Sequence, residues 1–161
     1  MKEYTIAAKI KSASINELSL PQKDLIDAAR KAAAKAYAPY SNFSVGAAVL
    51  LDNSTIVTAS NQENAAYPSG ICAERVALFY AGAEYPDQKA QAIAIVALTG
   101  GRWTGPVSPC GACRQVMLET QSRSGSPMQV LLAGNEECYL IDNAAQLLPL
   151  AFGAKDLAAG N

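Results

Sequence analysis

The run from Ala92 to Leu98 constrains the fold more than any other stretch of this chain, because every residue in it is apolar. A strand with this pattern is buried on both of its faces. The sheet that contains it must therefore be covered by helices above and below. The run predicts an α/β architecture in which the sheet forms the middle layer.

Helical and strand-like patterns elsewhere supply the layers that this strand requires. Val45–Leu51 and Thr55–Ala59 flank the turn signal Asp52-Asn53, which predicts an antiparallel hairpin and hence a mixed sheet. We expect a single domain over residues 1–161, with a three-layer α/β/α fold and a mixed sheet of about five strands. The other expected strands are Gln129–Ala133 and Cys138–Ile141, the expected helices are Pro21–Tyr37, Cys72–Gly82, Gly111–Gln121 and Asn143–Leu148, and Gly100–Ser108 is expected to be a loop.

Histidine is absent from the chain. This absence excludes Ser-His-Asp and Cys-His catalysis, together with every metal site that needs an imidazole. Acid–base chemistry near neutral pH must then use another group, and a carboxyl with a raised pKa is the best candidate.

The charge and hydropathy patterns exclude two classes of partner. The net charge is -1 and there is no basic run, whereas nucleic-acid binding depends on Lys and Arg that neutralise phosphates. No apolar run approaches the roughly 20 residues of a membrane helix. Because Met1–Lys11 also lacks the pattern of a signal peptide, we expect a cytoplasmic protein that binds neither nucleic acid nor membrane.

The cysteines carry the strongest chemical signal. In a cytoplasmic chain disulfides are rare, so metal binding or catalysis is the first interpretation. Cys110 and Cys113 form a C-x-x-C motif, which by itself is compatible with a redox dithiol, half of a zinc ribbon or two buried thiols, although a redox dithiol would leave Cys72 without a role. Cys138 stands alone in an expected strand, and we interpret it as a small buried hydrophobe.

Cys72, Cys110 and Cys113 together offer three thiolates and leave a fourth coordination position open. That layout is typical of a catalytic Zn²⁺ site, since structural sites are closed by four ligands. Both segments also begin expected helices, where free backbone N–H groups and the helix dipole stabilise thiolates.

Two charged residues follow Cys72 closely. Glu74 can lie near the metal without binding it, and in a dry pocket its raised pKa suits a proton shuttle. Arg75 can offset the negative charge of the thiolates, although an ordinary surface arginine is the alternative interpretation.

These residues make the chain similar to the cytidine deaminase family, and in particular to its small homotetrameric branch with three cysteine ligands. The zinc-deaminase signature is His or Cys followed by x-Glu, and later by P-C-x-x-C. Here it is met by Cys72-Ala73-Glu74 and Pro109-Cys110-Gly111-Ala112-Cys113, and the supporting segments are Tyr40–Ala48, Asn61–Tyr67 and Leu147–Phe152. The sequence departs from the family at Leu150, where Gly is frequent, and at Pro68–Ile71, which lacks a frequent extra cysteine.

The resemblance implies a function and a set of site residues. The enzyme would convert cytidine or deoxycytidine to uridine or deoxyuridine in pyrimidine salvage, with a zinc-bound hydroxide attacking C4 and Glu74 shuttling protons. Phe152 would cover the base in a neighbouring subunit of a homotetramer with shared active sites, although packing on its own core is an equal alternative from the residues alone. The implied substrate contacts are Asn61 and Glu63 to the ribose hydroxyls, Phe43 against the pyrimidine, the backbone at Ala73 to the base, and the Pro109 carbonyl toward the departing amine.

Three other functions remain to be compared with this one. A deaminase of a nucleoside-like antibiotic such as blasticidin S would share the chemistry, but Asn61 and Glu63 favour a substrate with ribose. A nucleic-acid editing deaminase is disfavoured by Cys72 in the place of histidine and by the lack of basic runs. A non-catalytic zinc-binding protein gives no reason for a carboxylate at Glu74.

Overall fold

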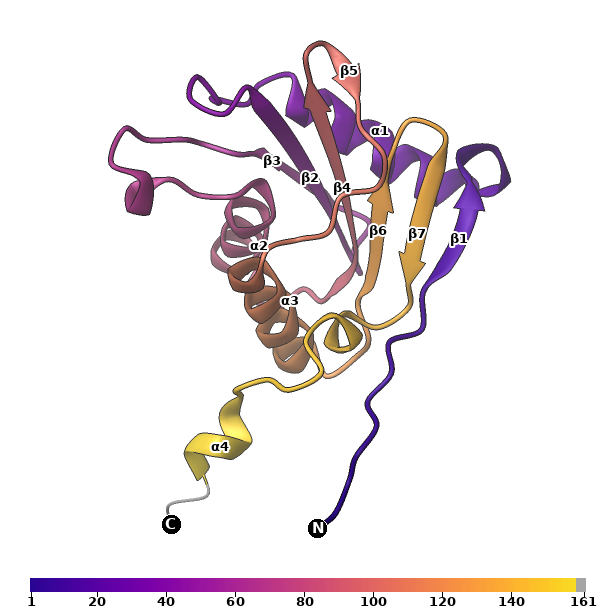
Figure 1. Ribbon diagram of the computed structural model, residues 1–161, viewed down its shortest axis with the longest axis vertical. Coiled ribbons are helices and arrows are strands. Elements are labelled where there is room, and N and C mark those ends of the chain that lie inside the picture. Colours follow the sequence, from indigo (N-terminus) through magenta and orange to yellow (C-terminus); the bar gives the residue numbers. More distant parts are fainter. Residues whose placement is uncertain (159–161) are drawn as a thin grey trace.

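A seven-stranded mixed sheet forms the centre of the computed structural model, which describes residues 1–158. The strand order is β1-β7-β6-β4-β2-β3, and β5 pairs with β4 beyond this path (Figure 1). Among the described strands, β4 and β6 pair in parallel and all other neighbours are antiparallel. The strands are β1 (Lys11–Ser14), β2 (Phe43–Leu51), β3 (Ile56–Ser60), β4 (Ala90–Thr99), β5 (Arg102–Trp103), β6 (Gln129–Ala133) and β7 (Glu137–Ile141).

Strand β4 is buried on both faces, as its apolar run predicted. Ile93 and Ile95 enter the core under two of the helices, whereas Ala94 and Val96 enter a second core on the opposite face. The side chains alternate between the two cores because successive residues of a strand point to opposite faces.

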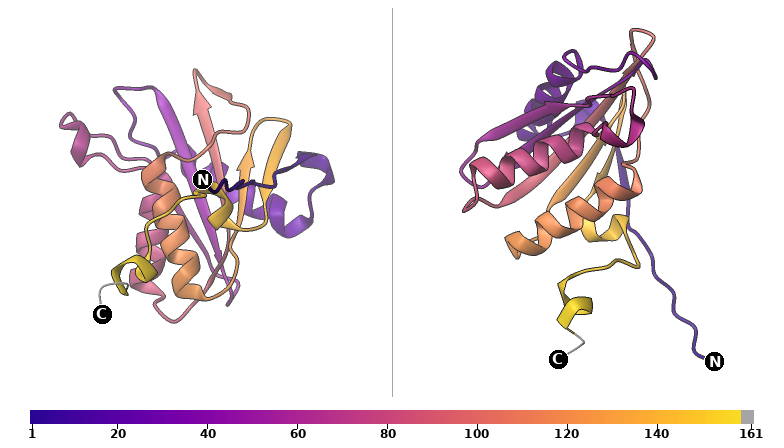
Figure 2. Two further views of the ribbon diagram at one scale, coloured as in Figure 1. Left: turned by 60° about the horizontal axis from the view of Figure 1, so that its bottom comes forward. Right: turned by 90° about the vertical axis from the view of Figure 1, so that its left-hand side faces the viewer.

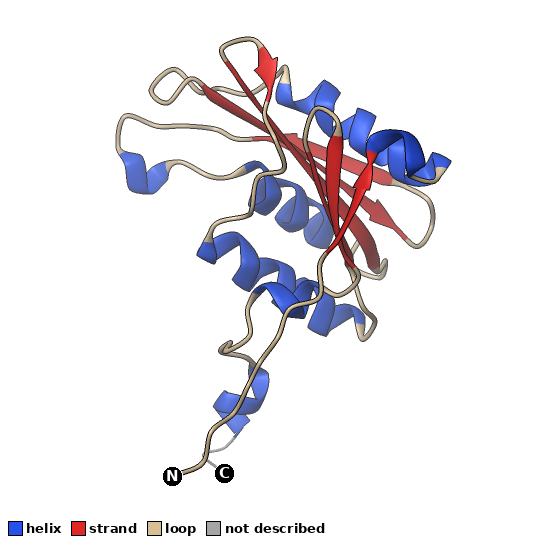
Figure 3. Ribbon diagram, turned by 45° about the vertical axis from the view of Figure 1, so that its right-hand side comes forward, coloured by secondary structure: helices blue, strands red, loops and turns tan. Residues whose placement is uncertain are grey.

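Helices cover both faces of the sheet and confirm the three-layer α/β/α fold. One face carries α1 (Leu20–Ala33), and the other carries α2 (Ala73–Glu84) and α3 (Gly111–Ser124) side by side (Figures 2 and 3). The short helices are η1 (Ile15–Glu17), η2 (Tyr67–Ser69), η3 (Ala144–Leu147) and α4 (Ala154–Ala158). No helix within residues 1–158 combines the length and the apolar character needed to cross a bilayer.

The sheet has seven strands where about five were expected, because two short strands carry no hydrophobic pattern. Strand β1 has the polar sequence KSAS and lies at the edge of the sheet, against β7. Strand β5 lies inside the expected loop Gly100–Ser108. There Gly100 and Gly101 adopt positive φ angles of 56° and 74° and reverse the chain onto β4.

Helix α1 ends at Ala33 rather than at the expected Tyr37. The backbone of Tyr37 instead joins the loop after β3: its N–H donates to the Asn61 carbonyl, and its own carbonyl accepts from Glu63 N–H. This exchange draws the loop that follows α1 to the loop that carries Asn61 and Glu63.

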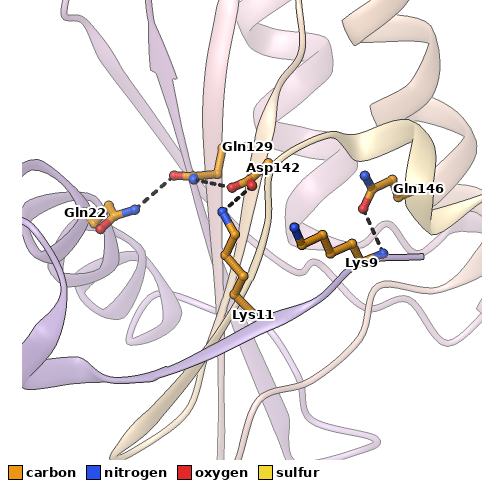
Figure 4. A network of polar contacts seen from close by, with 6 residues as sticks. All are labelled: Lys9, Lys11, Gln22, Gln129, Asp142 and Gln146. Carbon is orange, nitrogen blue, oxygen red and sulfur yellow. Dashed lines mark hydrogen bonds and ion pairs between the residues drawn. The ribbon is translucent and has the colours of Figure 1, made fainter. Parts of the chain in front are cut away.

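The N-terminal segment is attached to the sheet edge by polar contacts (Figure 4). Lys11 Nζ pairs with the Asp142 carboxylate, and the Asp142 carboxylate also accepts from Gln129 at 3.3 Å. The backbone N–H of Lys9 donates to Gln146 in η3 at 3.1 Å. These contacts connect β1 to the end of β7 and to the start of the C-terminal segment.

Candidate active site

Two helix N-termini bring the three cysteines together. Cys72 is the N-cap of α2, Cys110 is the N-cap of α3, and Cys113 lies in the first turn of α3. Because α2 and α3 lie side by side on one face of the sheet (Figure 2), both N-termini present unpaired N–H groups at the same place. The helix dipoles therefore stabilise negative charge on all three sulfurs.

The sulfur positions fit a tetrahedral zinc ion. Cys72 Sγ lies 3.9 Å from Cys110 Sγ, and Cys110 Sγ lies 3.4 Å from Cys113 Sγ. All three sulfurs lie within 4.8 Å of one another. Zn–S bonds of about 2.3 Å in tetrahedral geometry would place two sulfurs about 3.8 Å apart. The cluster thus provides three ligands at the spacing that Zn²⁺ requires.

Cys138 takes no part in this cluster. It is fully buried in β7, within the core under α1, whereas Cys113 belongs to the core under α2 and α3. The sheet separates the two thiols. Burial raises the pKa of Cys138 to about 11, so it stays a neutral thiol near neutral pH.

The thiols of the cluster differ in acidity. A hydrogen bond from Cys113 lowers the pKa of Cys72 to about 5, and the positive charge of Arg75 lowers it further. The same hydrogen bond to Cys72 raises the pKa of Cys113, and burial raises it further. Within this pair the negative charge therefore resides on Cys72 and the proton on Cys113.

Arg75 supplies a second observation that fits a metal–thiolate centre. Its Nε atom is buried and has no hydrogen-bond partner among residues 1–158. A buried donor without an acceptor is costly. Cys72, Cys110 and Cys113 lie close enough to interact with the charge of Arg75, and three ionised sulfurs are stable together only when a cation binds them.

Glu74 lies next to the thiols in the first turn of α2 and is 5% exposed. Burial raises the pKa of its carboxyl, and the negative charge of Cys72 raises it further. A carboxyl in this environment takes up and releases protons closer to neutral pH than an exposed one does. This is the property that the sequence required of an acid–base group in a chain without histidine.

A pocket of about 470 Å³ opens beside Cys72 and Arg75. Its volume falls within the usual range for small-molecule sites. Two of the predicted substrate contacts, Asn61 and Glu63, line it as well. The lining is Tyr40, Ser41, Asn61, Gln62, Glu63, Asn64, Tyr67, Gly70, Ile71, Cys72 and Arg75.

Asn61 holds the backbone at the start of β2. Its Oδ1 accepts from Val45 N–H at 2.8 Å, and its Nδ2 donates to the Phe43 carbonyl at 3.0 Å. One further hydrogen on Nδ2 and one lone pair on Oδ1 remain for another partner. The side chain is thus fixed in direction and retains capacity to bind a ligand.

Glu63 is held by the loop before β2. Its carboxylate accepts from the Ser41 hydroxyl and from the backbone N–H groups of Tyr40, at 2.9 Å, and Ser41, at 3.3 Å. The hydrogen bond from the Ser41 hydroxyl is the main cause that lowers the pKa of Glu63. Glu63 therefore stays ionised and serves as a hydrogen-bond acceptor rather than as a proton shuttle.

The remaining predicted contacts do not belong to the lining of the pocket, as formed by residues 1–158. Phe43 begins β2 and pairs with Thr99 of β4. Ala73 is the fully buried first residue of α2. Pro109 is buried beside Cys110, and Phe152 is 61% exposed near the end of the chain.

The sequence reasoning missed two aromatic residues of the pocket. The rings of Tyr40 and Tyr67 stand edge to face, with their centroids 6.0 Å apart. Both line the pocket while remaining largely exposed. They belong to segments that carry the family resemblance, but a tyrosine in a loop has no pattern that assigns it a role.

The comparisons with known proteins agree with this geometry. The family model described as the cytidine and deoxycytidylate deaminase zinc-binding region matches residues 21–125. A cytidine deaminase of Sporosarcina psychrophila is 44% identical over 134 residues, which cover 83% of this chain and 93% of that protein.

Solved structures give the same result. The crystal structure of cytidine deaminase from Burkholderia pseudomallei has a TM-score of 0.66 and 42% identity, and the match covers 81% of this chain and 98% of that one. The corresponding structure from Mycobacterium tuberculosis has a TM-score of 0.61 and 34% identity, with 84% and 99% covered. The sulfur cluster, the buried carboxyl and these similarities together place the chain in the cytidine and deoxycytidylate deaminase family.

Proposed function

We propose that this protein is a zinc-dependent cytidine deaminase, which hydrolyses cytidine or deoxycytidine to uridine or deoxyuridine and ammonia in pyrimidine salvage. The observation that carries the proposal is the position of Glu74. It is a buried carboxyl with a raised pKa beside three convergent thiols. A purely structural zinc site has no use for such a group, whereas hydrolytic deamination needs one.

Cys72, Cys110 and Cys113 would hold the metal. When bound, Zn²⁺ lowers the pKa of a water at its open coordination position and so provides a nucleophile near neutral pH. Arg75 offsets the negative charge of the sulfurs, which would otherwise make that water less acidic. The helix N-termini of α2 and α3 act in the same direction.

Glu74 moves the protons of the reaction. Its carboxylate takes a proton from the attacking water and delivers it to ring N3 of the pyrimidine. The second proton of that water then goes to the 4-amino group, the C4–N bond breaks, and ammonia leaves. Every transfer uses one carboxyl, and its raised pKa brings the protonated and ionised forms closer in free energy at neutral pH than they are in an exposed carboxyl.

The substrate contacts that we propose are those that the family resemblance implies. Asn61 and Glu63 line it with fixed side chains and bind the ribose hydroxyls. Phe43 packs against the pyrimidine, the backbone at Ala73 binds the base, and the Pro109 carbonyl accepts a hydrogen bond from the departing amine. The two ribose contacts favour a nucleoside over the free base.

We also propose a homotetramer with shared active sites in the cytoplasm, where the free thiols stay reduced. Large apolar side chains are exposed on α2, with Phe79 and Tyr80 each 54% accessible, and at the C-terminus, where Leu150 is 84% accessible. Exposed apolar surface of this kind typically marks interfaces. Gln115 holds the Phe152 carbonyl at 2.9 Å while the Phe152 side chain stays exposed. The aromatic ring is thus available to cover the base in a neighbouring subunit.

Replacing Glu74 tests the proposal. Glu74→Gln keeps the size of the side chain and removes its ability to transfer protons, so it should bind zinc and fold as the wild type does. Turnover of cytidine should fall by at least about 10²- to 10⁴-fold, the usual contribution of acid–base catalysis. Metal analysis and circular dichroism provide the controls. A variant that keeps more than about a tenth of wild-type turnover would assign the proton transfers to another group.

A further inference from the structure

Arg114 connects two backbone carbonyls on either side of the α3 N-terminus. Its Nε donates to the Pro109 carbonyl at 2.9 Å, and its Nη1 donates to the Leu147 carbonyl at 3.0 Å. Pro109 precedes the zinc-ligand segment, and Leu147 closes η3, from which the C-terminal segment with Phe152 departs. One half-buried guanidinium thus links these two parts of the chain.

The location of this arginine is unfavourable for the helix itself. Arg114 lies in the first turn of α3, and a cation at a helix N-terminus opposes the helix dipole. Within residues 1–158, no carboxylate forms an ion pair with it to offset that effect. Its side chain instead folds back over the helix end to reach the Pro109 carbonyl, five residues earlier. Helix stability therefore does not account for a positive charge at this position.

We propose that Arg114 is a positioning residue for the departure of ammonia, an inference that rests on the proposed deaminase function. A carbonyl oxygen accepts two hydrogen bonds. Arg114 occupies one lone pair of the Pro109 carbonyl, fixes the direction of the carbonyl group and leaves the second lone pair for the 4-amino group. The planar guanidinium holds this geometry because a second N–H is anchored on Leu147.

The effect should grow as the reaction proceeds. The amino group of bound cytidine is a neutral donor, whereas the amine that accepts a proton before it leaves is cationic. Hydrogen bonds from charged donors are stronger than those from neutral ones. A carbonyl held in place therefore stabilises the departing amine more than the substrate, and this difference lowers the barrier rather than the Michaelis constant.

The test compares Arg114→Met with the wild-type holoenzyme. Loss of both hydrogen bonds should lower kcat for cytidine by about 10- to 100-fold, with KM changed by less than about threefold, because a displaced hydrogen-bonding group costs that much in rate. Zinc content should stay at the wild-type level. Arg114→Lys keeps one donor and should recover part of the loss. It also serves as the test variant if Arg114→Met does not fold.

Two controls separate positioning from a merely structural role. A pyrimidin-2-one ribonucleoside carries hydrogen in place of the 4-amino group, so its dissociation constant should differ by less than about threefold between wild type and Arg114→Met. Arg123→Met removes an exposed arginine from the opposite end of α3 and should not reproduce the loss of kcat.

In Arg114→Met, a pyrimidin-2-one dissociation constant that rises in parallel with the loss of turnover would show that Arg114 only maintains the structure of the pocket. An unchanged kcat in Arg114→Met, in an assay where the wild type deaminates cytidine, would also overturn the proposal. Absence of deamination in the wild type itself would refute the proposed function instead.

Discussion

Gly46 is the position at which the fold tolerates a side chain least. It lies in β2, directly under α1, and an added Cβ would stand 2.0 Å from the Ala29 carbonyl oxygen and 2.6 Å from the Ala33 nitrogen. Both atoms belong to the helix backbone and cannot rotate away. An ordinary contact needs at least 3.4 Å, so α1 would have to move by about 1.4 Å from the sheet in Gly46→Ala. That movement opens the core in which Leu25 and Ile26 are buried.

The cost follows from this displacement. Overpacking a well-packed core typically costs about 1–3 kcal/mol, and a helix forced off a sheet lies at the upper end of that range. In a domain of this size each kcal/mol lowers Tm by about 2–4 °C. Gly46→Ala should therefore melt about 6–12 °C below the wild type in thermal denaturation followed by circular dichroism, with both proteins saturated with zinc.

Gly105→Ala is the matched control, because an added Cβ there meets no atom within 4 Å among the described residues. Its Tm should stay within about 2 °C of the wild type. If Gly46→Ala melted as close to the wild type as Gly105→Ala does, the tight packing of α1 on β2 would be refuted.

Two further predictions concern the shared site and the lone thiol. Truncation after Pro149 removes Leu150 and Phe152, so it should lower kcat/KM for cytidine and weaken the assembly in sedimentation; a stable assembly with undiminished kcat/KM would reject the shared site. Cys138 is neutral in the folded protein up to about pH 11 but ionises near its usual pKa of 9.0 when unfolded. Its contribution to stability is therefore complete below pH 9 and is lost as the pH rises toward 11, by up to about 3 kcal/mol. Urea titrations should show a smaller alkaline loss in Cys138→Ala, which should retain its zinc, and an equal loss in both proteins would contradict the assignment.

The layers of the fold were predictable where the sequence pattern is strong. The apolar run of β4 required cover on both faces, and the hairpin of β2 and β3 follows from the turn signal Asp52-Asn53 between two strand-like segments. Strand β1 was missed because an exposed edge strand with a polar sequence has no period-two apolar pattern; its pairing with β7 is a contact between distant parts of the chain.

The site also contains residues that the sequence predicts and one that it does not. Cys110 and Cys113, like Cys72 and Glu74, were predictable as neighbours because each pair lies at the start of one helix, and the family signature joined the two segments. Arg114 was not, since one of its acceptors is the carbonyl of Leu147, far along the chain. A backbone carbonyl is present at every residue, so no sequence pattern reveals which one a side chain will meet.

Metal-dependent deamination of cytidine is the most direct test of the function assigned to the cluster of Cys72, Cys110 and Cys113. The conversion of cytidine to uridine is followed by ultraviolet absorbance with the protein as purified, after removal of metal by a chelator, and after titration with Zn²⁺. We expect activity in the first sample, its loss in the second, and its recovery in the third, complete at about one zinc ion per chain, as three protein ligands with one open position require. Full activity in the metal-free protein, or no uridine formed by the zinc-saturated protein, would contradict the account.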